Sequence, residues 1–453
     1  MTGTMPREVF CGWGRTNPSR ARLRTPTTVD ELASLVSSLG PRGAIVRGLG
    51  RSYGDAAQNS GGTVIDLTGW RRILDIDSES AIVTVEPGVS LDELMRALLP
   101  HGLWVPVIPG TRQVTIGGAI AADVHGKNHH ISGSFGNHVI TMDLLLASGD
   151  TLTLTPDGPE AALFWATIGG MGLTGIITKA TIALKRVESS YFLVDTEKVA
   201  NLDELLTTLS ARDDDYEYSV AWFDTATTGK DLGRAVVTRG DNALLSDLEP
   251  RQRSTALELS ARQIGHIPFA LPNGLVNRVT ARAFNALWYA KAPTKRDREV
   301  QNISRFFHPL DLIGDWNRVY GSKGFCQYQF VMPFGAEDAF TAAVRRIAQS
   351  RHVSSLNVLK RFGPTNRSPL SFPIPGWTLA IDLPVRSGLQ AMLDELDELV
   401  IAAGGRVYLA KDSRTSAHAL HAMYPRLDEF AALRATIDPN SRFHSDLSRR
   451  LDL

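Results

Sequence analysis

Apolar and polar positions recur with two different periods along the first 190 residues. In residues 29–39 and 91–99, large aliphatic side chains return every three or four positions, which places them on one face of a helix. Residues 176–184 instead alternate isoleucine or alanine with threonine and other residues, a pattern typical of a strand. Short strands with intervening helices predict an α+β region that ends near residue 190.

Cap and turn residues mark the ends of some of these elements. Ser90 precedes the second helix, Glu93 lies three residues further on, and Gly102 follows the last turn. This combination predicts a capping box at the start of the helix and a glycine at its end. Residues 148–150, Ser-Gly-Asp, separate two apolar runs and predict a hairpin.

The pattern changes after residue 190. Helical and strand periodicities alternate here, which predicts a second α/β unit with an antiparallel sheet. The last segment, from residue 405, starts as a strand and becomes helical. The helical patterns of the second unit are residues 199–211, 335–350 and 388–405, and its strand patterns are residues 216–224, 324–333 and 377–385.

Composition narrows the class of protein. A chain of 453 residues is long enough for two domains. Lys+Arg and Asp+Glu both number 48, so there is no net field that would favour nucleic acid as a partner. Cys11 and Cys326 are too few for a disulfide framework. We see no apolar core of a secretory signal and no run long enough to span a membrane, so any membrane contact is expected to be peripheral.

A glycine-rich stretch, "AIVRGLGRSYGDAAQNSGG", follows the first predicted strand. Gly48, Gly50 and Gly54 read G-x-G-x-x-x-G, one residue longer than the Rossmann fingerprint, and no helical pattern follows them. A literal G-x-G-x-x-G at residues 170–175 has a helix before it and a strand after it, the reverse of the Rossmann order. A nicotinamide dehydrogenase is therefore disfavoured, and the first stretch taken alone could be a plain surface turn.

Four glycine-rich stretches within about 130 residues have a common explanation. Glycine lets backbone N–H groups approach a polyanion without a Cβ in the way. A long cofactor with a pyrophosphate and a planar ring needs several such approaches, whereas a single phosphate loop would not. The four stretches are residues 44–62, 107–130, 132–139 and 168–180.

Several of these motifs, in this order, resemble the vanillyl-alcohol-oxidase-type FAD-binding family: "GLGRSYGDAA", "VEPGVSLDEL", "PVIPGTRQVTIGGAIAADVHGKNHH", "GGMGLTGIIT" and the C-terminal "RVYLAKDS". The resemblance covers essentially the whole chain. It implies a two-domain α+β flavoprotein, with residues 1–190 and 405–453 forming the FAD-binding domain and residues 191–404 forming the substrate-binding domain with its antiparallel sheet.

The resemblance also implies which residues contact the cofactor. These are Val46, Arg47, Gly48, Leu49, Gly50, Arg51, Ser52, Tyr53, Gly54, Asp55, Ala56, Gly110, Thr115, Ile116, Gly117, Gly118, Ala122, Asp123, Val124, His125, Ile177 and Tyr408. Many relatives carry a histidine in the first loop that bonds covalently to the flavin. Arg51 stands there in this chain, and because a guanidinium is not a nucleophile at ordinary pH, we expect noncovalent FAD.

Within the family, the motifs are most similar to oxidases of a lipid-linked ribose. This implies FAD-dependent oxidation of the ribose 2′-hydroxyl of a decaprenyl-phosphate-linked ribose to a 2′-keto sugar. A partner keto-reductase would complete the epimerisation to an arabinose donor for cell-wall arabinan, in a periplasmic or membrane-associated setting. Two alternatives stay open: a sugar-alcohol or aldonolactone oxidase of the same fold, and a non-catalytic binding component of a cell-wall assembly.

Candidate active-site residues come from both regions. Gln327 and Gln329 lie two apart in a strand pattern, so both amides share one face, where a sugar is a reasonable partner. A lysine at the end of an apolar strand, such as Lys360 or Lys411, usually buries its stem and leaves the charge in water. The resemblance implies catalytic roles for Lys411, His125, Lys127, Gln329 and Tyr53, and substrate contacts by Lys127, Gln327, Gln329, Lys360, Ala380 and Lys411.

Three of these assignments need comment. Lys411 and His125 both remain candidates for the group that accepts the hydroxyl proton. His125 and His129, four residues apart, could suggest a zinc site, but glycine and asparagine lie between them and the H-E-x-x-H glutamate is missing, so no metal is expected. Some relatives carry a cysteine, which nitroaromatic inhibitors attack, where this chain has Ala380.

Residues 260–292 form an apolar segment with two prolines. Leu275, Val279 and Leu287 form a stripe at helical spacing, and Arg278 and Arg282 lie one turn apart. One interpretation is an ordinary packed helix after a loop. The other is a mobile lid or interfacial segment for a lipid-linked substrate, with the two arginines near its phosphate.

Overall fold

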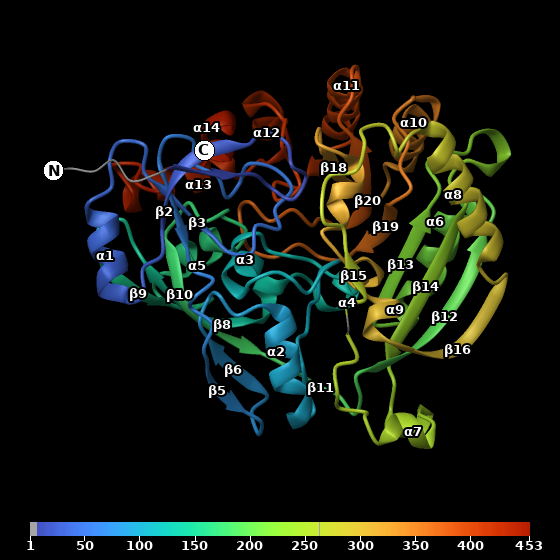
Figure 1. The fold of residues 1–453 in the computed structure, drawn as a ribbon, viewed down its shortest axis with the longest axis horizontal. Coiled ribbons are helices and arrows are strands. Elements are labelled where there is room, and N and C mark those ends of the chain that lie inside the picture. The colour runs from blue at the N-terminus through green and yellow to red at the C-terminus, as the bar shows by residue number, and fades with distance from the viewer. Residues whose placement is uncertain (1–6, 262) are drawn as a thin grey trace.

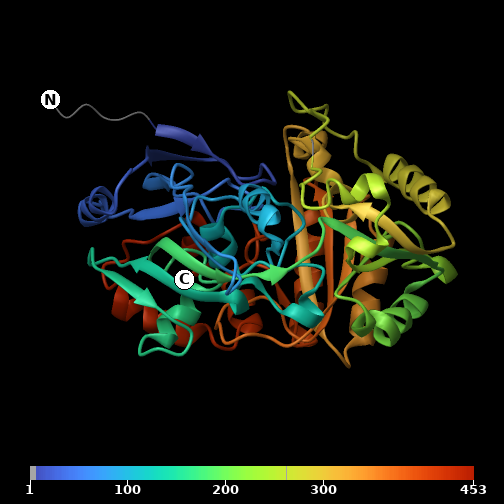
Figure 2. The same cartoon turned by 90° about the horizontal axis from the view of Figure 1, so that it is seen from below.

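The computed structural model describes residues 7–261 and 263–453, and it divides into two bodies that lie side by side (Figures 1 and 2). The first body contains the N-terminal part of the chain, coloured blue to teal, together with the red C-terminal helices. The second body, coloured green to orange, is built around one large sheet. Both views in the figures show the same division, so the C-terminal segment returns to the N-terminal body.

The first body contains two main sheets. In the smaller one, β2, β4 and β3 run parallel and β1 is antiparallel to β2. Neighbouring strands in the larger one are antiparallel, including the β8–β9 hairpin predicted around residues 148–150. In spatial order the sheets are β1 (Arg7–Phe10), β2 (Ser19–Arg24), β4 (Thr63–Asp66), β3 (Ala44–Arg47), and β5 (Ile73–Asp77), β6 (Ile82–Val85), β10 (Ile176–Ala183), β8 (Val139–Leu145), β9 (Thr151–Leu154).

Helices from both ends of the chain surround these sheets. The capping box predicted at Ser90 and Glu93 is present, which confirms the start of α2. The C-terminal helices join the N-terminal body through a bridge between Ala44 and Phe443 and an ion pair between Asp55 and Arg450 of 2.7 Å. The helices are α1 (Val29–Ser37), α2 (Leu91–Leu98), α3 (Ile116–Ala121), α4 (His129–Ser132), α5 (Ala161–Thr167), α12 (Ala417–Met423), α13 (Leu427–Ile437) and α14 (Asp446–Leu451).

The second body is one eight-stranded antiparallel sheet, as the sequence predicts. Its edge strand β21 pairs with β18 and begins after residue 404, so it comes from the C-terminal segment. In spatial order the strands are β16 (Lys295–Asn302), β12 (Tyr191–Val199), β14 (Ala235–Asn242), β13 (Tyr218–Phe223), β19 (Asn357–Phe362), β20 (Gly376–Pro384), β18 (Phe325–Pro333) and β21 (Arg406–Val407). Helices α6 (Leu202–Arg212), α10 (Glu337–Gln349) and α11 (Leu389–Ala402) accompany it.

One hydrophobic core joins the two bodies. Its buried side chains include Ile45 and Leu173 of the first body and Phe330 and Leu379 of the second. Because apolar burial is continuous across the boundary, the face of the second sheet is held at a defined place against the first body. The site described below lies at this junction.

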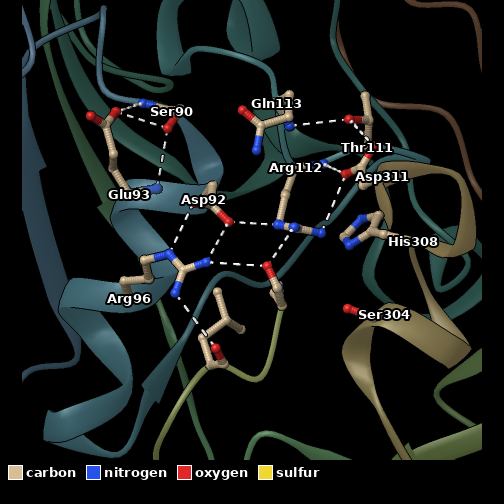
Figure 3. A network of polar contacts seen from close by, with 12 residues as sticks. Ser90, Asp92, Glu93, Arg96, Thr111, Arg112, Gln113, Ser304, His308 and Asp311 are labelled. Atoms are coloured by element: carbon tan, nitrogen blue, oxygen red, sulfur yellow. Dashed lines mark hydrogen bonds and ion pairs between the residues drawn. The ribbon is translucent and has the colours of Figure 1, made fainter. Parts of the chain in front are cut away.

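A buried charged network also crosses the boundary (Figure 3). The Arg112 guanidinium donates to Asp92 at the start of α2 (2.5 Å), and it is paired at 3.5 Å with Asp311 of the 3-10 turn Pro309–Leu312. Arg112 also donates to the carbonyl of Ala261 at 3.0 Å. One arginine of the first body therefore holds both ends of the stretch between residues 261 and 311.

The apolar segment between these ends contains a short strand, β15 (Gly265–His266), paired with β17 (Ile313–Gly314), and helix α8 (Arg278–Lys291). A helix is present, but its predicted apolar stripe is not the packed face: Leu275, Val279 and Leu287 are 47%, 76% and 55% exposed. The buried positions of α8 are Ala281 and Asn285. Polar contacts hold that face, since the Asn285 amide donates to Asp224 and to the carbonyl of Ser354.

The segment lies over one end of the second sheet. Arg386, two residues after β20, donates to the carbonyl of Val276, and the backbone N–H of Lys323, just before β18, donates to Asn273. In the described ranges, no helix is both long and apolar enough to cross a bilayer. The remaining short elements include α7 (Pro250–Arg253), α9 (Ile303–Phe306) and the pair β7 (Leu103–Trp104) and β11 (Lys185–Arg186).

Candidate active site

The predicted pyrophosphate loop follows β3 and offers free backbone donors. In residues 7–261 and 263–453, the N–H groups from Leu49 to Ser52 donate to no protein acceptor. Consecutive free N–H groups form a concave site that favours an anion. Gly50 has a φ of +65°, which an L side chain adopts only at a cost, so the turn depends on glycine. The loop therefore fits a pyrophosphate group.

Neighbouring segments hold this loop in place. The Arg47 guanidinium donates to the carbonyls of Cys11 (2.9 Å) and Ala57 (3.1 Å). The N–H of Trp13 donates to the Ser52 carbonyl at 2.8 Å. At Gly54, a Cβ would lie 1.8 Å from the Asp412 carbonyl oxygen, so any side chain there would push the C-terminal segment away.

Other residues predicted to contact the cofactor shape the site without offering free donors. At the start of α3, the N–H groups of Ile116, Gly117 and Gly118 already donate to Val89, Pro87 and Thr115. Asp123 is fully buried, and its carboxylate accepts from Ser371, Asn366 and the N–H of Gly136. Of the others, Val46 lies in β3, Ile177 lies in β10 with 7% of its surface exposed, Gly110 has open space beside it, and Val124 and Ala122 lie just after α3.

Arg51 lies beside this loop. Its guanidinium is 4.1 Å from the ring centroid of Trp13, and burial lowers the pKa of Arg51 from its usual value. Its Nε has no partner within the described chain. The residue that replaces the histidine of many relatives is thus held against an aromatic ring as a cation.

The second sheet supplies a polar face at the junction. Strands β18 and β20 pair so that Gln329 lies opposite Ala380 and Gln327 lies opposite Asp382. Successive residues of a strand point to opposite faces, so Gln327 and Gln329 share the face predicted from their spacing. Lys360 of β19 pairs with Thr378 of β20, which adds a lysine to the same region.

Asp382 is a member of the site that sequence reasoning missed. It is fully buried, and its carboxylate accepts from Gln327 Nε2 at 2.5 Å and from the Tyr320 hydroxyl at 3.5 Å. Burial raises the pKa of Asp382 above its usual value, while the hydrogen bond from Gln327 and the charge of Lys411 oppose the shift. A carboxylate in the otherwise apolar strand "WTLAIDLPV" was the available signal, since a charged residue is rarely buried without a partner.

His125 belongs to the first body and contacts the polar face of the second sheet. Its Nε2 is 2.9 Å from Gln329 Nε2, and rings of Phe362, Phe372 and Tyr408 surround it with centroids 4.8, 5.5 and 5.0 Å away. Burial holds the pKa of His125 well below its usual range, and the nearby charge of Lys360 acts in the same direction. The imidazole is therefore neutral at pH 7. The Tyr408 hydroxyl donates to the Ala122 carbonyl at 2.7 Å, which ties the C-terminal segment to this loop.

Three predicted lysines lie half-buried at the junction. Lys411 Nζ lies 3.9 Å from the ring centroid of Tyr53, whose hydroxyl accepts from Gln327 at 3.1 Å. Burial lowers the pKa of Lys411 to about 7, with Asp382 raising it and Lys360 lowering it. Burial likewise lowers the pKa of Lys360 to about 8 and that of Lys127 to about 7. A lysine of this kind can exchange a proton near neutral pH.

The other cationic side chains predicted for the site contribute less to its centre. Lys127 donates to the Phe306 carbonyl and lies 4.3 Å from the Phe306 ring centroid, so the protein already uses its ammonium group. Lys360 donates to the Gly126 carbonyl at 3.4 Å. Arg278 and Arg282 lie on α8 at the rim, where Arg282 donates to Ala226 at 3.3 Å. The structure thus brings Lys411, Tyr53, Gln327, Gln329 and His125 together, and the arginines stay outside.

Comparisons with known proteins agree with this arrangement. Residues 21–155 match the family model described as an FAD binding domain, and residues 378–451 match that of D-arabinono-1,4-lactone oxidase. The chain is 51% identical over 446 residues to decaprenylphosphoryl-beta-D-ribose oxidase of Mycolicibacterium smegmatis, which covers 98% of this chain and 97% of that protein.

Other relatives match the chain at lower identity. L-gulono-1,4-lactone dehydrogenase of Mycobacterium tuberculosis is 24% identical over 439 residues, which is 94% of each chain. Delta(24)-sterol reductase of Pisum sativum is 30% identical over 142 residues, which is 31% of this chain and 25% of that protein.

Proposed function

The chain belongs to the decaprenylphosphoryl-β-D-ribose oxidase family of FAD-binding oxidoreductases, and we propose that its reaction converts the ribose 2′-hydroxyl of decaprenylphosphoryl-β-D-ribose to the 2′-keto sugar. The observation that carries this proposal is the cluster of polar groups at the junction of the two bodies. There a lysine with a pKa of about 7 lies beside two strand-borne amides and next to the free donors of the pyrophosphate loop.

Each part of the site has a role in this reaction. The loop from Leu49 to Ser52 would hold the pyrophosphate of FAD, and the bound cofactor would supply the acceptor for the hydride from the C2′ carbon. Gln327 and Gln329 would orient the sugar through its hydroxyl groups. The surrounding aromatic rings exclude water from the reacting atoms, which strengthens the polar contacts that remain.

The hydroxyl proton must leave as the carbon is oxidised, and a nearby group has to accept it. Lys411 can do so in its neutral form, which its depressed pKa makes available at pH 7. His125 is also neutral and close, and its contact with Gln329 places it at the same face. These two are the residues through which the protein would control the proton.

The visible spectrum of the purified, FAD-loaded protein tests the proposal. Under anaerobic conditions, a prenylphosphoryl ribose should bleach the flavin absorption near 450 nm, whereas free ribose and ribose 5-phosphate should do so much more slowly. Equal bleaching by all three compounds would contradict recognition of the lipid-linked substrate.

We also propose that the protein works at a membrane surface, together with a keto-reductase that reduces the 2′-keto product to the arabinose epimer. The exposed apolar side chains of α8 and the segment before it support this, because they lie where the segment covers one end of the second sheet. Arg278 makes no polar contact in the described parts of the chain, so it is free to meet a phosphate. A periplasmic setting would suit such a substrate.

Vesicle sedimentation tests the membrane contact. The double variant Val279→Asp/Leu287→Asp should lose binding to vesicles that contain anionic lipid. Val9→Asp, at a valine of β1 in the first body that is 59% exposed, is the control and should bind as the native protein does. If both variants bind equally, α8 does not contact the membrane.

A second function, oxidation of a free aldonolactone, is favoured by the match of residues 378–451 to the lactone oxidase model. The two functions differ in their need for a lipid. Flavin bleaching by an aldonolactone at the rate seen with the prenylphosphoryl ribose would make this second function the first choice.

A further inference from the structure

We infer that His125 carries its single proton on Nδ1 and donates a hydrogen bond to the flavin ring, so that, of the two candidate bases, Lys411 and not His125 accepts the proton of the substrate hydroxyl. This inference deepens the proposed function and rests on it for the role of Lys411. The assignment of the histidine tautomer itself stands on a chain of hydrogen bonds within the protein.

The chain begins at Thr378 of β20. The Thr378 hydroxyl donates to the carbonyl of Phe330 at 2.9 Å, and a hydroxyl has only one hydrogen. Its oxygen can therefore only accept from Gln329, whose amide group lies 3.3 Å away. The group of Gln329 that faces Thr378 must be the NH2, because the amide oxygen has no hydrogen to give.

The same NH2 group faces the histidine. Gln329 Nε2 lies 2.9 Å from His125 Nε2, and its second hydrogen is available for this contact. A nitrogen that receives this hydrogen must be the bare nitrogen of the ring. A neutral imidazole carries one proton, so in His125 the proton is on Nδ1.

His125 Nδ1 has no partner in the described parts of the chain, although it is buried and the residue is only 6% exposed. Aromatic rings surround the imidazole, and in the described parts of the chain no acceptor lies within hydrogen-bond distance of Nδ1. A buried N–H without an acceptor is costly, so a resident group is expected to supply the acceptor. The flavin ring offers carbonyl oxygens and ring nitrogens for this purpose.

This tautomer decides between the two candidates for the proton acceptor. The bare nitrogen Nε2 is already occupied by Gln329 and faces the protein, and Nδ1 holds a proton that it can only donate. His125 therefore positions the cofactor. Of the two candidates for the proton acceptor, Lys411 remains, with its Nζ against Tyr53 and its pKa lowered to about 7.

Nitrogen-15 spectra of the FAD-loaded protein with labelled histidine test the tautomer directly. We expect the one-bond coupling to hydrogen on Nδ1 of His125, identified by its loss in His125→Asn. In Gln329→Glu a carboxylate, which only accepts, replaces the NH2 group, so the proton should appear on Nε2. A proton on Nε2 in the native protein, or an unchanged pattern in Gln329→Glu, would overturn the inference.

Two substitutions of the histidine test the donor without any substrate. His125→Asn keeps a donor at the place of Nδ1, whereas His125→Gln keeps one only at the place of Nε2. FAD binding should weaken roughly 2- to 10-fold in His125→Gln, the equivalent of one net hydrogen bond, and should change less in His125→Asn. The reverse order, or no difference, would contradict a donor at Nδ1.

The two readouts separate this inference from the proposed function. Neither the spectra nor the FAD titration contains the sugar substrate, so a failure of the lipid-linked ribose to bleach the flavin leaves both unaffected. If the substrate does bleach the flavin, His125→Asn should retain the pH dependence of reduction and Lys411→Ala should lose it.

Discussion

Replacing Arg112 with alanine should loosen the apolar segment between residues 261 and 311, which lies over one end of the second sheet, while leaving the rest of the fold in place. Arg112 is the only side chain in the network of Figure 3 that contacts both ends of this segment, through the Ala261 carbonyl and Asp311. Its side chain is 4% exposed and that of Asp311 is 7% exposed. Alanine would leave two carboxylates, Asp92 and Asp311, without the charge that lies between them.

The magnitude follows from what remains around each carboxylate. Breaking a buried ion pair by removing one partner typically costs about 3–5 kcal/mol. Asp311 keeps the Thr111 hydroxyl at 2.8 Å and the backbone N–H of residue 112 at 3.1 Å, and Asp92 keeps Arg96 at 3.0 Å. These remaining donors place the cost near the lower end, about 3 kcal/mol, or roughly 100-fold in the equilibrium for local opening.

Hydrogen exchange of the FAD-loaded protein measures this opening. The N–H of Ile264 donates to the Leu312 carbonyl and that of Ile267 to the Gly314 carbonyl, so both amides report on the pairing of β15 with β17. In Arg112→Ala their exchange should be faster by up to about 100-fold. Amides of β18 and β20, in the central sheet, should keep their native rates.

Arg96 offers a matched control in the same network. It also pairs with Asp92, but its side chain is 46% exposed and the pair lies within one helix, so its loss should cost only about 0.3–0.5 kcal/mol. Arg112→Lys keeps the positive charge but lacks the several N–H donors of the guanidinium. Its exchange rates should lie between those of Arg112→Ala and Arg96→Ala. Equal exchange rates in Arg112→Ala and Arg96→Ala would refute the argument that burial decides how much each arginine of this network contributes to stability.

Three further predictions concern the site itself. Acid precipitation should leave a colourless pellet and a yellow supernatant, because Arg51 cannot bond to the flavin; a yellow pellet would mean a covalent link. Lys411→Ala should keep FAD and lose about 10²–10⁴-fold in the rate of flavin reduction. In the native protein that rate should rise with pH through about 7, since the neutral amine forms as pH passes the pKa of Lys411, and a rate that falls over this range would exclude Lys411 as the base. Ala380 has no nucleophile, so mass spectrometry after turnover with a nitroaromatic inhibitor should find no added mass on the peptide of β20, and an adduct there would mean that the strand has been aligned wrongly.

Local patterns in the sequence were enough to predict much of the fold. The capping box at Ser90 and the hairpin at residues 148–150 depend on neighbours within a few positions, and both are present. The spacing of the glycines after β3 was enough to exclude a Rossmann loop. The shared face of Gln327 and Gln329 follows from the period of a strand alone.

Residues that meet only across the fold could not be placed in this way. Asp382 became part of the site because β18 and β20 pair in a register that sets it opposite Gln327. Period two would have placed Thr378, Ala380 and Asp382 on one face, but not beside the two glutamines. Register between strands separated by about 50 residues depends on long-range packing, which local periodicity does not contain.

The role of His125 and the outward face of α8 also depend on contacts between distant parts of the chain. Gln329 lies 204 positions from His125 in the chain, and only their contact, with Thr378 behind it, determines which ring nitrogen carries the proton. The stripe of Val279 and Leu287 predicted a helix from its period, yet the polar contacts of Asn285 turned that stripe toward solvent. Sequence by itself determined which side chains share a face, because that depends on backbone geometry; what each face meets was decided by tertiary structure, because it depends on which buried polar groups find partners.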